Sequence, residues 1–435
     1  MRQTFHGVAN LQDPKHSRGL FHGLIPSLCL LAASAVLPAT AVELEDHDHA
    51  VLPIDATMTL TEVVDRTVEY APAYVELGSR QALADAWQNR GDSWMSGPLA
   101  LTVRYQSDRW GDDLGLQEIE YGIQMALWKW GQRRSARELG RSLQTEADAA
   151  PLALRWEIAG LIRRLVWEIE RAEAELELLE ESEVLAAKLA ATVNRRYELG
   201  DVARREVLLA RSAELDVAAR VAEARVAMTD AERTYRSVTG LDRRPVTPVE
   251  TLSTLANVDA SHPALQLATA AVEGARAARG VVRESGMTSP TLMIGPRRER
   301  SVFGQDFEDS IGIFVTVPFG GRSHIDTQVT AAGRLVAARE AELRATSREL
   351  ELGMHEAAHS LSAARHNVEL ASERAELAKE GYEMGEIAYA RGEIGLIELL
   401  SLQEVYLDAR RQAAQFGIEV NRQTALYNQA VGVMP

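Results

Sequence analysis

The first residues whose types and spacing could support chemistry are His355, Glu356 and His359, which spell the motif H-E-x-x-H. On a helix, histidines four residues apart share one face and can bind Zn²⁺, and the glutamate between them can act as the general base of a protease. A catalytic zinc site needs a third protein ligand, and none is evident in the sequence. Pairs of this spacing are also common on helix surfaces. We therefore predict that the chain is not a metalloprotease, and the role of the two histidines stays open.

A second candidate is the segment Glu45–His49, which reads E-D-H-D-H. Alternating histidine and carboxylate side chains can bind Zn²⁺ or Cu²⁺, so His47 and His49 are candidate metal ligands. The alternative interpretation is a disordered polar tail. The sequence offers no phosphate-binding loop and no persuasive Ser-His-Asp arrangement. We predict that the protein is not an enzyme, with no catalytic residue and no cofactor.

A third feature is a repeated phrase, in which a tyrosine is followed after two residues by glycine, an acidic residue and an aliphatic one. It occurs as YELGDVA from Tyr197, as YEMGEIA from Tyr382 and as YARGEIG from Tyr389. Glycine just after a long helix is a favourable cap because it enters the left-handed region at little cost. The acidic residue that follows suits the positive end of the next helix, and we expect Asp201 or Glu393 to start it. The phrase therefore predicts a turn between two antiparallel helices.

Counting decides which late copy is the partner of the early one. Tyr197 and Gly240 are 43 positions apart, and so are Tyr389 and Gly432, whereas Tyr382 lies 50 positions before Gly432. The partner of YELGDVA is thus YARGEIG, at an offset of 192. YEMGEIA then lies one heptad upstream, within the preceding helix.

The elements that must position these residues alternate between two periodicities. Apolar and polar side chains alternate in residues 99–106, 117–127 and 310–319, which predicts strands. Residues 132–197 are rich in Ala, Leu, Glu and Arg, and a helix of these 66 residues would be roughly 100 Å long. In the next helix, apolar residues spaced alternately three and four apart form a heptad seam from 207 to 238.

The order helix, hairpin, long helix, helix occurs twice, so the chain contains two copies of one structural repeat. We expect a mostly α protein with a membrane β part. Its predicted parts are a signal peptide (1–41), an acidic, histidine-containing tail (42–58), a first repeat (59–240, with a β-hairpin at 98–128 and long helices at 132–198 and 202–239), a linker (241–261) and a second repeat (262–435, with a β-hairpin at 290–319 and long helices at 322–390 and 394–431).

The N-terminus and the charge limit the possible locations and partners. A basic start, an apolar run from Leu20 to Leu37 and Ala39-Thr40-Ala41 are typical of a cleaved secretory signal. The single cysteine, Cys29, lies within it and follows a leucine, so we expect it to be removed and not lipidated. A net charge of −16 argues against nucleic acid as the main partner.

On these residues the chain resembles the TolC-like outer-membrane factors, the exit ducts of tripartite efflux and type I secretion systems. The motifs that carry the resemblance, besides the duplicated order, are Val317–Arg322 (VPFGGR), Tyr389 and Gly392 followed by Ile397–Leu400 (IELL), and the terminal Gly240 and Gly432. The resemblance implies a trimer whose six hairpins close a 12-stranded β-barrel, continued by a periplasmic α-helical barrel. The acidic histidine segment together with the tip motif favours the heavy-metal (cobalt–zinc–cadmium) efflux branch.

The resemblance also implies roles for the helix-to-helix turns, which dock a periplasmic adaptor and form the closed aperture. Carried over by position, the docking residues are Gly200, Asp201, Val202, Gly392, Glu393 and Ile394, and the aperture residues are Glu206, Glu398 and Tyr389. Three glutamates around one axis would select cations and repel one another. The sequence departs from the family at Ile394, where a basic partner is expected, and at Ser401, where an acid is expected, so the aperture should be held more by packing. The alternative for both glutamates is a solvated helix surface.

The implied function is the outer-membrane exit duct of a tripartite efflux system, which passively conducts metal cations or small toxic compounds. Its partners would be a periplasmic adaptor (membrane fusion protein), an inner-membrane pump such as a proton-driven RND transporter, and outer-membrane lipid. Its location would be the outer membrane with a large periplasmic portion. Two alternatives stay open: a soluble periplasmic coiled-coil scaffold or adaptor, and the duct of a type I protein secretion system. The substrate and the pump class are not determined by the sequence.

Overall fold

The structure is a computed structural model that describes residues 52–286 and 288–435. The expected signal peptide and the candidate ligands His47 and His49 lie outside the described residues. Contacts group the described residues into one compact unit. Its elements in chain order are β1 Ile54–Asp55, α1 Leu60–Tyr70, α2 Tyr74–Asp92, β2 Ala100–Ser107, β3 Gln117–Ala126, α3 Gln132–Glu198, α4 Arg204–Thr239, β4 Arg244–Pro245, α5 Pro263–Ser285, β5 Thr291–Arg300, β6 Glu308–Thr316, α6 Arg322–Arg391 and α7 Leu396–Ala430.

The chain around Pro72 separates two helices. Helix α1 begins after Thr59, whose hydroxyl caps it by accepting a hydrogen bond from the Glu62 amide at 3.2 Å. It ends at Tyr70, and α2 starts only at Tyr74. Because proline disfavours the helical conformation of the residue before it, the helix breaks here and does not merely bend.

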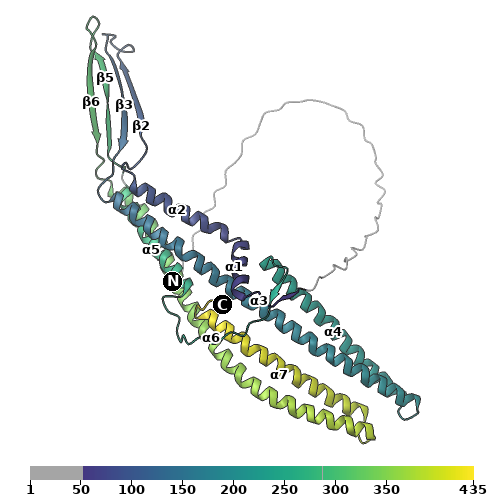
Figure 1. Cartoon of the computed structure of the whole chain (residues 1–435). Helices are drawn as coiled ribbons and strands as arrows, with labels where there is room; N and C mark the ends of the chain where they lie inside the picture. The colour runs from purple at the N-terminus through teal and green to yellow at the C-terminus, as the bar shows by residue number, and fades with distance from the viewer. Residues whose placement is uncertain (1–51, 287) are drawn as a thin grey trace, which may run out of the picture. The chain divides into compact units, whose positions relative to one another are not determined.

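The two expected β-hairpins join in one antiparallel sheet of order β2-β3-β5-β6 (Figure 1). Strand β3 of the first hairpin pairs with β5 of the second, with Ile123 opposite Ile294. The repeats therefore share a sheet and are not separately folded halves.

The four long helices occur where the heptad and helical patterns predict them. Helix α3 has 67 residues and α6 has 70, so each is roughly 100 Å long. Helices α4 and α7 begin two residues later than expected, at Arg204 and Leu396, after the extended residues Ala203 and Gly395. Asp201 and Glu393 thus belong to the turns, and the expectation that they start the next helices is wrong.

Helices α3 and α6 pack against different helices along different parts of their length. Near the sheet the packing order is α2, α3, α5, α6, and toward the helix-to-helix turns it is α4, α3, α7, α6 (Figure 1). A hydrophobic cluster that includes Val63, Ile162 and Tyr235 joins α1, α3 and α4. Every position of the expected seam of α4 from 207 to 238 is buried or half-buried, which confirms the heptad interpretation. No helix within residues 52–286 and 288–435 is long and apolar enough to cross a bilayer.

The linker segment, residues 241–261, is tied to the helices by buried polar contacts. The Glu250 carboxylate accepts hydrogen bonds from Nε and Nη2 of Arg163, both at 2.8 Å. The side chain of Arg163 is fully buried and also donates from Nη1 to the carbonyl oxygen of Val433 at 3.1 Å. A buried guanidinium needs this many acceptors, because each unpaired donor would cost free energy.

Candidate channel surfaces

The two helix-to-helix turns have the same backbone structure. Gly200 has φ +82° and Gly392 has φ +75°, both in the left-handed region. The Asp201 amide donates to the Arg196 carbonyl at 2.8 Å, and the Glu393 amide donates to the Ala388 carbonyl at 2.9 Å. These are equivalent bonds of a Schellman cap, 192 positions apart. The pairing of YELGDVA with YARGEIG is therefore confirmed.

The remaining phrase, YEMGEIA, lies inside α6, as counting predicts. Its glycine, Gly385, faces α7, where an added Cβ would come within 2.5 Å of Leu402 Cδ1. Gly385 thus lies at a close helix contact and not in a turn, and a larger residue would require the Leu402 side chain to shift. The phrase is therefore part of a helix wall.

A hydrophobic cluster joins the two turns, and we call it the tip cluster. Its buried members are Val193 of α3, Ala210 of α4, Tyr382 and Tyr389 of α6, and Leu396 and Leu399 of α7. Val202 and Ile394, one from each turn, pack against it, while Gly200, Asp201, Gly392 and Glu393 are exposed. In each turn, the exposed glycine and acidic residue are thus followed by an aliphatic residue that packs on the tip cluster.

Tyr389 is the member of the tip cluster with the most polar contacts. The guanidinium of Arg196 lies 4.9 Å from the centre of its ring, and Arg196 Nη1 donates to its carbonyl oxygen at 3.2 Å. Burial raises the pKa of Tyr389, Arg196 lowers it, and Glu206 raises it. Its hydroxyl is buried and has no hydrogen-bond partner among the described residues.

The structure brings together some of the expected aperture residues. Glu206, in the first turn of α4, is half-buried and close enough to affect the pKa of Tyr389. Glu398, in the first turn of α7, is exposed between the buried Leu396 and Leu399. Tyr389 and Glu206 are thus neighbours, whereas Glu398 faces solvent in the single chain.

Arg196 and Tyr382 were not predicted as site residues from the sequence. The ring of Tyr382 stacks on that of Tyr406 at 5.4 Å, and its hydroxyl donates to Glu386 at 3.0 Å. Burial, followed by the hydrogen bond to Glu386, raises the pKa of Tyr382. A cavity of about 340 Å³ beside these residues is also lined by Arg196 and Tyr389. Arg196 directly precedes the first phrase and Tyr382 opens the second, so the phrases already pointed to this place.

The four-stranded sheet has one apolar and one charged face. The side chains of the apolar face are largely exposed and come from alternate positions of all four strands: Leu101, Val103, Tyr105, Ile119, Tyr121, Ile123, Ile294, Ile311, Ile313 and Val315. Exposed apolar side chains in such a continuous array mark a surface that contacts another apolar phase.

The charged face carries a network of carboxylates and guanidinium groups. Glu118 and Glu120 are buried on β3. Arg297 Nε lies 3.1 Å from Glu118, and Arg104 lies 3.8 Å from Glu118 and 3.7 Å from Glu120. Two arginines thus compensate the repulsion between the carboxylates. The alternation predicted from the sequence separates these two faces.

The tryptophans next to the strands fall into two groups. Trp128 is half-buried and its Nε1 donates to the Ser93 carbonyl at 2.9 Å, so it packs within the hairpin base. Trp110 and Trp130 are almost fully exposed. Only the exposed pair fits an interfacial role, in which an aromatic ring lies at a membrane boundary.

His355 and His359 lie on an exposed face of α6, with their ring centres 4.4 Å apart. In the part of the chain that the structure describes, no group of three or more His, Cys, Asp or Glu side chains could hold a metal ion.

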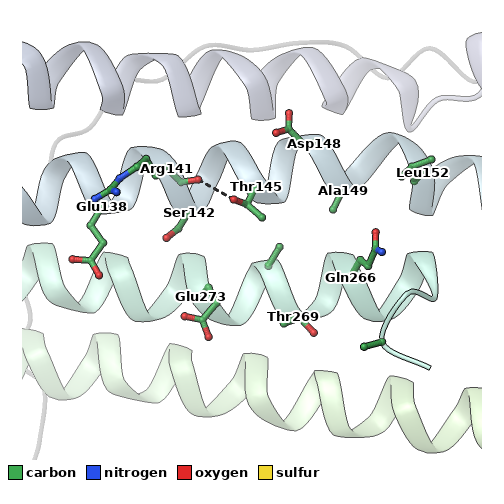
Figure 2. A pocket seen from close by; sticks show the side chains of 12 residues that line it. Glu138, Arg141, Ser142, Thr145, Asp148, Ala149, Leu152, Gln266, Thr269 and Glu273 are labelled. Atoms are coloured by element: carbon green, nitrogen blue, oxygen red, sulfur yellow. Dashed lines mark hydrogen bonds between the residues drawn. The ribbon is translucent and has the colours of Figure 1, made fainter. Parts of the chain in front are cut away.

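A cavity of about 750 Å³ lies between α3 and α5 (Figure 2). Glu138, Asp148 and Glu273 contribute carboxylates to its lining and Arg141 contributes a guanidinium, while small side chains such as Ala149 lie between the helices. These charged groups are exposed. The cavity is therefore an open groove between two helices, lined by both charged and small apolar side chains.

Paired long helices, joined to a sheet that is apolar on one face and charged on the other, define the architecture to compare with known proteins. Residues 255–429 match the family model described as outer membrane efflux protein. The expected resemblance to this family is confirmed, and the match lies mainly in the second repeat. A comparison with curated proteins gives no significant match.

Similar solved structures support the same fold. The outer membrane protein VceC from Vibrio cholerae has a TM-score of 0.69 at 15% identity, covering 86% of this chain and 96% of that chain. The CmeC outer membrane channel of Campylobacter jejuni has a TM-score of 0.67 at 16% identity, covering 86% and 85%. A membrane protein from Pseudomonas aeruginosa has a TM-score of 0.71 at 13% identity, covering 94% and 97%. At these identities the likeness establishes the fold.

Proposed function

We propose that this protein is the outer-membrane exit duct of an efflux system and conducts its substrate passively. The observation that carries the proposal is the two-faced sheet. Its apolar face from Ile119 to Met125 spans six residue steps, or about 20 Å. This is close to the apolar band of about 25 Å in outer-membrane barrels. The charged face with Glu118 and Arg297 would line a water-filled exit.

Closure of the sheet requires further copies of the chain. Strands β2 and β6 are the edges of the four-stranded sheet, and lipid cannot satisfy unpaired backbone groups. Three copies supply twelve strands and remove every edge. A trimer would also extend the paired long helices into a tunnel through the periplasm.

The tip of this tunnel is proposed as the aperture and the docking surface. Tyr389, Glu206 and Glu398 would narrow the entrance, with Arg196 holding Tyr389 in place. The exposed turn residues Gly200, Asp201, Gly392 and Glu393, each backed by Val202 or Ile394, would contact a periplasmic adaptor. The adaptor would connect the duct to an inner-membrane pump, such as a proton-driven RND transporter.

Bilayer insertion provides the main test of the duct. The purified protein should migrate as a heat-modifiable trimer and give stable conductance in planar bilayers. Ile123→Arg places a charge on the apolar face, which costs about 2–4 kcal/mol near the middle of a bilayer, and should abolish insertion. The neighbouring Gln124→Arg lies on the charged face and should insert. Recovery of the unmodified protein wholly as a soluble monomer would support the scaffold alternative.

A second experiment addresses the aperture. The double variant Glu206→Ala, Glu398→Ala removes two carboxylates per copy, so ionic conductance should rise and cation selectivity should fall. Asp216→Ala, which removes an exposed carboxylate of α4 away from the tip, is the control. Unchanged conductance and selectivity in the double variant would show that these acids face away from the aperture.

A further inference from the structure

Two helices carry rows of exposed apolar side chains at heptad spacing. On α6 these are Leu370, Leu377 and Met384, each seven residues from the next and each more than half exposed. On α4 they are Leu208 and Leu215, also seven apart and more than half exposed. Within the chain, α4 packs on α3 and α6 packs on α5 and α7. Repeats of this spacing are typical of helices that pack along a partner helix.

The internal repeat identifies what covers these rows. Helix α3 corresponds to α6 and helix α4 corresponds to α7, at an offset of 192 near the tips. In the packing order α4, α3, α7, α6, the contact of α3 with α7 lies at the centre. When each helix of this contact is replaced by its equivalent in the other repeat, α3 becomes α6 and α7 becomes α4. The equivalent contact therefore joins α6 of one copy to α4 of a second copy. The contact that is present within one chain is therefore a template for the contact between chains.

The template fixes the register. Glu175 of α3 accepts from Gln415 of α7 at 3.0 Å and lies 3.7 Å from Arg411, and Glu181 lies 2.5 Å from Arg410. The helices are antiparallel, so the residue number rises along one helix as it falls along the other, and the sum of the two numbers describes the register. For these three contacts the sum lies between 586 and 591. Adding 192 on one side and subtracting it on the other leaves this value unchanged, so the same rule applies to α6 and α4.

We propose that α6 of one copy packs antiparallel on α4 of a second copy in the register set by the contact of α3 with α7. This inference rests on the proposed trimer and specifies which surfaces join and how they are aligned. The exposed apolar rows, which were not used to derive the register, agree with it. Leu377 meets Leu215 of the second copy and Met384 meets its Leu208, with residue numbers that add to 592 in both pairs, one residue above the upper value of the template.

The polar residues agree as well. His366 and His359 precede the apolar row on α6, and in this register they lie opposite Glu223 and Asp230 of the second copy, respectively. All four side chains are exposed in the single chain. The alignment thus places imidazole groups against carboxylates and leucine against leucine or methionine, which is the complementarity that a specific interface requires.

Cysteine cross-linking tests the register. The only native cysteine, Cys29, lies in the segment expected to be cleaved and is replaced by serine in all variants. The matched pairs are Leu377→Cys with Leu215→Cys and Met384→Cys with Leu208→Cys. The mismatched pair, Leu377→Cys with Leu208→Cys, uses the same substitutions but is displaced by one heptad, about 10 Å along the helix. A disulfide cannot form across that displacement, because Cα atoms more than about 7 Å apart cannot be bridged.

Oxidation of the matched pairs should give covalent dimers and trimers that reductant converts to monomers, and the mismatched pair should stay monomeric. Native mass and bilayer conductance are measured on the same samples. A conducting trimer whose matched pairs stay unlinked, or whose mismatched pair links equally well, would overturn the register and leave the duct intact. Absence of any trimer would overturn the register and the proposed function together.

A charge exchange gives a second, milder test. His366→Glu sets a carboxylate against Glu223 of the neighbouring copy, so the temperature at which heat dissociates the trimer should fall. Adding Glu223→His restores an opposite pair and should recover most of the loss. His366→Glu with the displaced Asp216→His is the control and should not recover it. A matched double variant that is no more heat-resistant than His366→Glu alone would contradict the register.

Discussion

Replacing Glu250 by alanine should release the linker segment from the helices. The Arg163 guanidinium is fully buried and Glu250 supplies two of its acceptors, at 2.8 Å each. Removing one partner of a buried ion pair costs about 3–5 kcal/mol. The Val433 carbonyl and the Gln429 side chain remain as acceptors, so the lower end, about 3 kcal/mol, is expected. That corresponds to roughly a hundredfold increase in the opening equilibrium of the segment.

Hydrogen exchange of the whole protein measures this opening. The Ser253 amide donates to Asn428 Oδ1 at 2.8 Å, and Asn428 Nδ2 donates to Glu250 at 3.0 Å, so loss of Glu250 should deprotect that amide. The control is Asp65→Ala, which breaks an exposed pair with Arg155 of α3. Such pairs contribute about 0–1 kcal/mol, so exchange should rise less than about fivefold. Equal exchange in the two variants would refute the reasoning.

Three further predictions concern the tip, the histidine pair and acid. Arg196→Ala removes the cation–π contact and the hydrogen bond to Tyr389, so channel opening in bilayers should become more frequent, whereas Arg196→Lys should retain part of the effect. His355→Ala with Glu356→Gln should leave substrate export unchanged, and a loss of export would contradict the non-catalytic interpretation. Burial lowers the pKa of His262 from 6.5, an effect that Asp259 partly opposes. The fold therefore favours the neutral form of His262, and the contribution of this group to stability is present above pH 6.5 and lost as the pH falls through its lowered folded pKa. His262→Asn keeps the cap of α5 without a titrating ring, so acid should lower the heat-dissociation temperature less than in the native protein.

Local patterns in the sequence were sufficient to predict the elements and their order. Heptad spacing predicted the seam of α4, and alternation predicted both strands of the first hairpin. The offset of 192 identified Gly200 and Gly392 as equivalent turns, because the left-handed conformation after a helix favours glycine. Each of these features depends on residues that are close in the chain, so a single sequence contains the information.

The contacts between distant segments could not be predicted in the same way. Arg196 near the end of α3 meets Tyr389 near the end of α6 only because the two helical hairpins pack together, and no periodicity in either helix specifies that partner. The same holds for Arg163 and Glu250, which lie 87 positions apart. The helix starts at Arg204 and Leu396 were missed because an extended residue must follow each turn before the new helix can begin. Such details depend on how the elements pack and not on local preference.

The duplicated turns have one difference that bears on how the proposed aperture opens. Tyr389 is 6% exposed, whereas its equivalent Tyr197 is 42% exposed. Tyr389 contacts Arg196 of its own chain. In a ring of copies, Tyr197 would instead contact α6 of the adjacent copy. There the equivalent of Arg196 is Ala388, which can neither stack on a ring nor donate from its side chain. The tip contacts would therefore alternate between a cation–π contact within each chain and a weaker contact between chains. Opening should begin at the contacts between chains, because those require the least free energy to break.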